Sequence, residues 1–105
     1  MGRPESPFAM TDQILRRRIA QVAGDSSKVF FTGHARVRLR TRKVLPTQVL
    51  HALRHGYVVE PAHRNIRGNW QCTLEARVAG DEVRVVAALM TDSEGEWVVI
   101  VTVMN

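Results

Sequence analysis

A histidine followed by arginines at helical spacing is the pattern in this sequence with the clearest chemical potential. Thr32 precedes Gly33-His34-Ala35, and Arg38 and Arg42 follow His34 at four-residue intervals. Residues four apart lie along one face of a helix. General-base chemistry requires a neutral imidazole, which the positive end of a helix favours. We therefore predict that His34 acts as an acid/base beside arginines that hold a phosphate. In the alternative, His34 only orders the helix start and the arginines pair with carboxylates of later strands.

Two polar residues interrupt strands that are otherwise apolar, Arg84 and Thr102. An arginine that is partly removed from water needs an anionic partner, which would be Glu75 or the phosphate of a ligand. Thr102 can donate a hydrogen bond to a phosphate, although threonine is common in strands for conformational reasons. The candidate catalytic residues are therefore His34, Arg38, Arg42, Arg84 and Thr102.

Metal and thiol chemistry have weaker support in the sequence. His51 and His55 have a four-residue spacing that can bind zinc, but only His63 and Cys72 are available to complete a site. Cys72 lies two residues after Trp70 in an alternating strand pattern, so both are expected on the buried face. This position favours a core residue over a nucleophile. The sequence also lacks a glycine-rich phosphate loop, a GxSxG motif and an acidic metal pair. We therefore predict no metal and no cofactor.

Positive charge is concentrated in the first two thirds of the chain. Residues 1–67 hold 13 of the 15 Lys+Arg and 4 of the 10 Asp+Glu, and only Lys28 and Lys43 are lysines. Arginine binds phosphate through a planar fork and stacks on bases, so this excess favours a polyanion, most simply a nucleic acid, as the partner. The alternative is a basic face that is simply solvated. The predicted nucleic-acid contacts are Arg36, Arg40, Lys43, Arg64 and Arg67.

Length and composition limit the classes of protein that remain. A chain of 105 residues with 45% hydrophobic residues fits one folded domain, which we assign to residues 11–105 after a flexible tail over residues 1–10. A single cysteine excludes an internal disulfide. The longest apolar stretch, Trp97 to Met104, is too short to cross a membrane, and no signal peptide is evident. We expect a cytoplasmic protein that does not bind membranes, of undetermined oligomeric state.

The elements that must position these residues are helices followed by strands. Apolar periodicity and capping residues predict helices over residues 11–23, 34–42 and 46–55, with Gly56 closing the third. Val29-Phe30-Phe31 fits either a short strand or the entry to the second helix.

The strands come after these helices. Residues 57–60 form a short strand that Pro61 stops, and residues 63–68 are a basic loop. Strands over residues 70–78, 83–91 and 97–104 then follow, with a turn at Gly80-Asp81. The predicted fold is α+β, with N-terminal helices on one face of a roughly four-stranded antiparallel sheet.

Three segments together resemble a known family. They are FTGHARVRLRTRKVLPTQVLHALRHGYVVE, EVRVVAALM and the closing VVIVTVMN. The pattern resembles the domain-of-unknown-function family DUF4258 over residues 29–104. Met104 departs from it, because the family often has tyrosine there. The matching positions are His34, Ala35, Arg38, Arg42, Gly56, Val85-Val86 and Thr102-Val103.

The resemblance implies a compact α+β fold similar to the RelE/barnase-like toxin nucleases. By this match His34 is the acid/base, Arg38 and Arg42 bind phosphate, and Thr102 is the family's strand threonine, whereas Arg84 comes only from the strand pattern. The expected function is a small, toxin-type, metal-independent ribonuclease. The alternative is a non-catalytic module of a mobile element or toxin-antitoxin system that binds nucleic acid or an acidic partner, such as an antitoxin or immunity protein.

Overall fold

The computed structural model describes residues 10–105. Of the predicted flexible tail, residues 1–9 lie outside this range, whereas Met10 packs against the hydrophobic core and belongs to the folded part. The helices are α1 (Asp12–Val22), α2 (Gly33–Arg42) and α3 (Pro46–His55), with a short 3-10 turn, η1 (Ser26–Lys28), between α1 and the first strand. The strands are β1 (Val29–Phe31), β2 (Tyr57–Arg64), β3 (Trp70–Val78), β4 (Asp81–Asp92) and β5 (Gly95–Met104).

The sheet has five strands in the order β1-β5-β4-β3-β2. The last four strands of the chain form an antiparallel meander, as the sequence predicts. The prediction of about four antiparallel strands is wrong at one edge. There Val29–Phe31 is a fifth strand that pairs with β5 in parallel, with Phe30 opposite Val99. This strand lets the chain enter α2 directly beside the C-terminal half of β5.

Strand β2 is longer than predicted, because it continues through Pro61 to Arg64. Proline cannot donate a ladder hydrogen bond, but β2 is an edge strand, where such a loss is tolerated. The pairing with β3 shifts register on both sides of Glu60. In addition, the Ala62 amide donates to the Asp12 carboxylate at 2.8 Å, which fixes the irregular edge to α1.

The predicted helix boundaries are confirmed to within two residues. The Thr32 hydroxyl accepts a hydrogen bond from the Ala35 amide at 3.1 Å and caps α2. The backbone angles of Gly56, which ends α3, are ones that any residue can adopt. Lack of space for a side chain, not backbone conformation, requires glycine there. A Cβ atom at Gly56 would lie 2.4 Å from the Ala52 carbonyl oxygen and 2.8 Å from that of Glu75. Only glycine therefore allows α3 to pass this close to β3.

The turn between β3 and β4 lies one residue earlier than predicted. Val78 pairs with Asp81, so Ala79 and Gly80 form a two-residue loop, with φ angles of 53° and 86°. Two positive φ angles define the type I′ turn that suits the twist of a hairpin.

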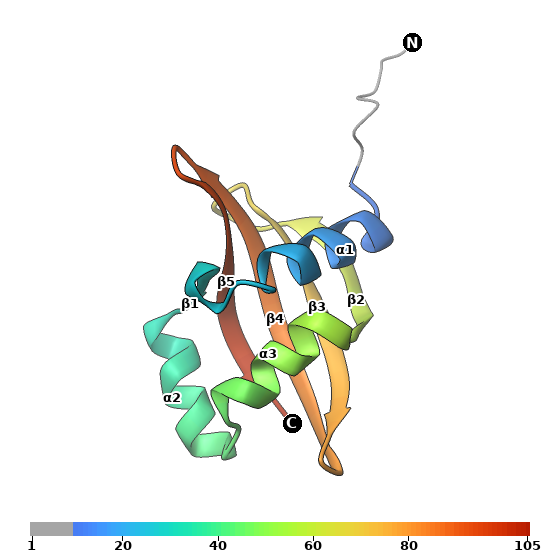
Figure 1. The fold of residues 1–105 in the computed structure, drawn as a ribbon, viewed down its shortest axis with the longest axis vertical. Coiled ribbons are helices and arrows are strands. Elements are labelled where there is room, and N and C mark those ends of the chain that lie inside the picture. The colour runs from blue at the N-terminus through green and yellow to red at the C-terminus, as the bar shows by residue number, and fades with distance from the viewer. Residues whose placement is uncertain (1–9) are drawn as a thin grey trace.

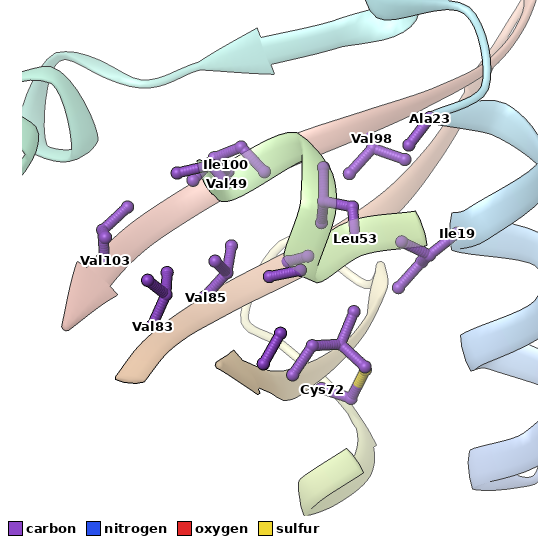
Figure 2. Close-up of a cluster of buried hydrophobic side chains, with 14 of the residues drawn as sticks. Ile19, Ala23, Val49, Leu53, Cys72, Val83, Val85, Val98, Ile100 and Val103 are labelled. Atoms are coloured by element: carbon purple, nitrogen blue, oxygen red, sulfur yellow. The ribbon is translucent and has the colours of Figure 1, made fainter. Parts of the chain in front are cut away.

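Helices α1 and α3 lie across one face of the sheet, and α2 lies beside β5 near the β1 edge (Figure 1). Side chains from both layers meet in the core, where Leu53, Val85 and Ile100 are fully or almost fully buried (Figure 2). Within residues 10–105, neither α1 nor α3 covers the opposite face, which we call the open face. The same described part of the chain contains no helix that is both long and apolar enough for a membrane span.

Candidate functional site

His34 and Thr102 meet where α2 begins. Thr32 fixes the helix start, because its hydroxyl donates to the Ile100 carbonyl at 3.0 Å as well as capping α2. Two residues further along the chain, His34 Nε2 lies 3.1 Å from Thr102 Oγ1, across 68 residues of sequence. The imidazole is exposed to solvent. Donation of Nε2–H to Thr102 leaves the lone pair of Nδ1 free to accept a proton.

A bulge in β5 directs Thr102 to the open face. Thr102 pairs with Val86, whereas Ile100 pairs with Ala87, so Val101 is an extra residue in the ladder. Such an insertion re-aims the side chains that follow it. Ile100 and Val103 point into the core, and Thr102 between them points away from it. The bulge therefore places the threonine hydroxyl where the first turn of α2 can reach it.

The two predicted helix arginines occupy different positions relative to His34. Arg38 follows His34 by about one turn and is half-buried, and its Nε atom has no hydrogen-bond partner among the described residues. Arg42 is the last residue of α2, and its carbonyl accepts a hydrogen bond from the Asn105 side chain at 3.0 Å. Eight residues of helix separate the Cα atoms of His34 and Arg42 by about 12 Å. Arg42 therefore lies more than a turn farther from His34 than Arg38 does, and its contact with the same phosphate stays a prediction.

Arg84 is held by a buried carboxylate on the open face. Its Nε donates to Glu75 Oε1 at 2.5 Å, and the Tyr57 hydroxyl donates to Glu75 Oε2 at 2.8 Å. These hydrogen bonds, from Tyr57 first and Arg84 second, lower the pKa of Glu75. The Glu75 pairing that the sequence left open is therefore present. It uses only Nε, so both terminal nitrogens of Arg84 remain available for a bidentate contact with an anion.

Arg84 and Thr102 share the open face on adjacent strands. Arg84 pairs with Met104, and Thr102 pairs with Val86, two residues along β4 from Arg84. Ordinary strand spacing puts the Cα atoms of Arg84 and Thr102 about 8 Å apart. The backbone of Arg84 is therefore near the His34–Thr102 pair, whereas its bond to Glu75 draws the guanidinium toward β3, on the other side of β4 from Thr102. Met104 pairs with Arg84 and lies beside it in this row.

The predicted nucleic-acid contacts fall into two groups. Three of them line a groove of about 470 Å³ on the outer side of α2 and its turn into α3, namely Arg36, Arg40 and Lys43. The other two lie near the loop between β2 and β3. Arg64 stacks over Trp70 at 4.9 Å from the ring centre and donates to the Gly68 carbonyl at 2.8 Å. Arg67 instead lines a second pocket, which His34 also lines.

This second pocket, the open-face pocket, has a volume of about 670 Å³. Thr32 and His34 line it at the start of α2, and strands β4 and β5 contribute apolar side chains. The loop between β2 and β3 contributes Asn65, Ile66, Arg67 and Asn69. Sequence reasoning did not single out three of its polar residues, Asn65, Asn69 and Gln71. The sequence does show these amide side chains clustered around Gly68, but the segment was interpreted only as a basic loop.

The weak metal and thiol candidates stay apart from this site. The rings of His51 and His55 lie 4.9 Å apart on α3, yet the described residues contain no group of three or more potential metal-binding side chains. Cys72 is buried in the core, and burial raises the pKa of its thiol to about 12. Such a thiol is a poor nucleophile at neutral pH.

The chain belongs to the family described as a domain of unknown function, DUF4258, whose model matches residues 31–105. The match begins at the last residue of β1 and includes His34, Arg84 and Thr102. Comparison with curated proteins and comparison with solved structures both yield no match. Helix α1 precedes the matched region and packs against the same core.

Proposed function

We propose that this protein is a metal-independent endoribonuclease with a RelE/barnase-like architecture and a toxin-type role in the cytoplasm. The observation that supports it best is the 3.1 Å contact between His34 and Thr102 on the open face. Arg84 lies on the same face one strand away, Arg38 follows His34 by about one helical turn, and His34 lines a pocket large enough for a nucleotide.

The chemistry is an intramolecular transesterification. Nδ1 of His34 takes the proton of a ribose 2′-hydroxyl, and the 2′-oxygen forms a bond to phosphorus. The bond from phosphorus to the 5′-oxygen then breaks, and that oxygen receives a proton from water. The products are a 2′,3′-cyclic phosphate and a free 5′-hydroxyl. Arg84 and Arg38 would stabilise the extra negative charge on the phosphate oxygens, which is usually the largest contribution in such a site.

The charge of α2 supports binding of further phosphates of the same strand. The helix contains four arginines and no acidic residue, and the described carboxylates form no ion pair with any of them. Binding of RNA along α2 should therefore release counterions and weaken steeply as salt is raised.

Incubation of the purified protein with total RNA and a chelator tests the proposal. Cleavage should persist in the chelator, and the new ends should carry 2′,3′-cyclic phosphates. Products ending in a 3′-hydroxyl would contradict the proposed chemistry, and intact RNA at every protein concentration would contradict the ribonuclease itself.

A second candidate function is binding without catalysis, to nucleic acid or to an acidic antitoxin or immunity protein. One observation favours it: His34 is the one histidine that lines the open-face pocket, as the structure describes it, and no carboxylate accompanies it there. No second acid/base group in that lining protonates the leaving oxygen. This function predicts salt-sensitive RNA binding with no turnover. Toxicity on expression that a neighbouring gene product relieves would instead favour the ribonuclease.

A further inference from the structure

We infer that the open-face pocket binds a purine base of the RNA strand whose phosphate lies at His34 and Arg84. This inference rests on the proposed function only in that RNA must reach the open face; it does not require cleavage. The pocket and the His34–Thr102 pair are continuous, because His34 itself lines the pocket.

The loop at one side of the pocket is fixed by its own hydrogen bonds. Asn65 Oδ1 accepts from the backbone amides of Arg67 and Asn69 at 3.0 and 3.1 Å. Its Nδ2 donates to Gln71 Oε1 at 3.0 Å, which orients the glutamine amide. A loop held in this way presents its remaining polar groups without a large ordering cost.

Two amide groups and one guanidinium remain available for a base. Among the described residues, no hydrogen bond engages the amide nitrogen of Gln71 or the side chain of Asn69. Amide side chains pair with the N6/N7 edge of adenine, and arginine pairs with the O6/N7 edge of guanine. Gln71, Asn69 and Arg67 therefore all match the edge that purines have and pyrimidines lack.

Apolar and aromatic side chains provide the surface on which a base can stack. Trp97 is held by Lys28, whose amine lies 4.3 Å from the ring centre, and by a 3.0 Å hydrogen bond from its indole nitrogen to Asp92. Phe30 is 55% exposed and lines the pocket from β1, opposite Val99 on β5. Stacking on such rings contributes about 1–3 kcal/mol per base in single-strand binding.

The charge of the rim favours a nucleic acid over a protein segment as the occupant. The charged side chain in the lining is Arg67, the described part of the lining contains no carboxylate, and the arginine helix α2 continues from the same end as His34. A base inserted here keeps its phosphates beside these cations, whereas an apolar peptide would leave the cations without an anionic partner. A protein occupant is therefore an outcome that the following experiment can reveal.

Binding of 2′-fluoro hexanucleotides tests the inference without cleavage, because a 2′-fluorine cannot attack phosphorus. The probes are hexamers of adenine, guanine and uracil and an abasic hexamer, measured by fluorescence anisotropy. The purine hexamers should bind about tenfold more tightly than the uracil and abasic hexamers. Gln71→Ala and Asn69→Ala should each reduce this preference, whereas Gln21→Ala on the exposed side of α1 should leave it unchanged.

A second readout follows the pocket directly. In a Trp70→Phe variant Trp97 is the remaining tryptophan, and purine hexamers should quench its fluorescence more than the abasic hexamer does. Equal binding of all four probes, with no quenching, would overturn the purine pocket and leave a protein segment as the occupant. If RNA is not cleaved but the purine preference is found, the pocket stands and the ribonuclease fails. If RNA is cleaved but no purine preference is found, the ribonuclease stands and the purine pocket fails.

Discussion

His34 Nε2 lies 3.1 Å from Thr102 Oγ1, and this contact joins the first turn of α2 to the bulged end of β5. Two features of the fold bring the residues together. The parallel strand β1 delivers the chain to the start of α2, and the extra residue Val101 turns Thr102 to the open face. The contact therefore depends on an edge strand and on a bulge, neither of which has a local sequence pattern.

Thr102→Val removes the hydroxyl while keeping the shape of the side chain. We expect the rate of RNA cleavage to fall about tenfold, because the imidazole loses the partner that orients it. The free energy of unfolding should change by only about 1 kcal/mol, since one partly exposed hydrogen bond is lost. Thr91→Val, at an exposed position of β4, is the matched control. An unchanged rate and pH–rate profile in Thr102→Val would show that the contact has no role in positioning His34.

Gly56→Ala should destabilise the fold strongly for its size. The new methyl group would lie 2.4 Å from one backbone oxygen and 2.8 Å from another, so α3 must move away from β3. We expect a loss of about 1–3 kcal/mol in urea unfolding. Gly33→Ala is the matched comparison, because its methyl group meets no atom within 4 Å and lies in the first turn of α2. That variant should be as stable as the parent or more stable by up to about 1 kcal/mol. Equal stability of the two variants would contradict the described approach of α3 to β3.

Glu75→Gln should remove a pH-dependent part of the stability. Hydrogen bonds from Tyr57 and Arg84 lower the pKa of Glu75 from its ordinary value of 4.5. A carboxyl with a lowered pKa in the folded state stabilises the fold fully above its unfolded pKa, and this contribution is lost as the pH falls through the folded pKa. Urea unfolding at pH 7 should therefore separate parent and variant, and the difference should shrink on acidification below about pH 4.5. Glu94→Gln, in the exposed β4–β5 turn, should show no such trend, and a constant difference for Glu75→Gln would refute the assignment.

Cys72 should be inert toward alkylating reagents in the folded protein. Burial raises the pKa of its thiol from 9.0 to about 12, so the thiolate fraction at pH 8 should fall about a thousandfold. Iodoacetamide labelling, followed by mass spectrometry, should be slow in buffer and complete in denaturant. Equally fast labelling in both conditions would place Cys72 outside the core.

Much of the fold was predictable because its signals are local. Capping by Thr32, the proline that opens α3 and the alternation around Cys72 each specify an element within a few residues. The parallel pairing of Val29–Phe31 with β5 was not predictable, because three apolar residues have no period and their partner lies far along the chain. The course of β2 through Pro61 was missed for a related reason. Only the finished sheet shows that β2 is an edge strand.

The candidate site was predicted in part. The residue types at His34, Arg84 and Thr102 singled them out as candidates, and strand register brings Arg84 and Thr102 onto one face. The separation of Arg42 from His34 could have been calculated from helix rise, but the approach of His34 to Thr102 depends on tertiary packing. The amides of the open-face pocket were missed because a polar loop has no pattern that reveals what it faces.

Single-turnover cleavage of a radiolabelled RNA by His34→Ala, beside the parent protein and in the presence of a chelator, tests the central claim most directly. Loss of general-base help should lower the rate by about 10²–10⁴-fold. The unfolding midpoint should change little, because the imidazole is exposed. Cleavage by His34→Ala at the parent rate would contradict the proposal that His34 takes the proton of the 2′-hydroxyl.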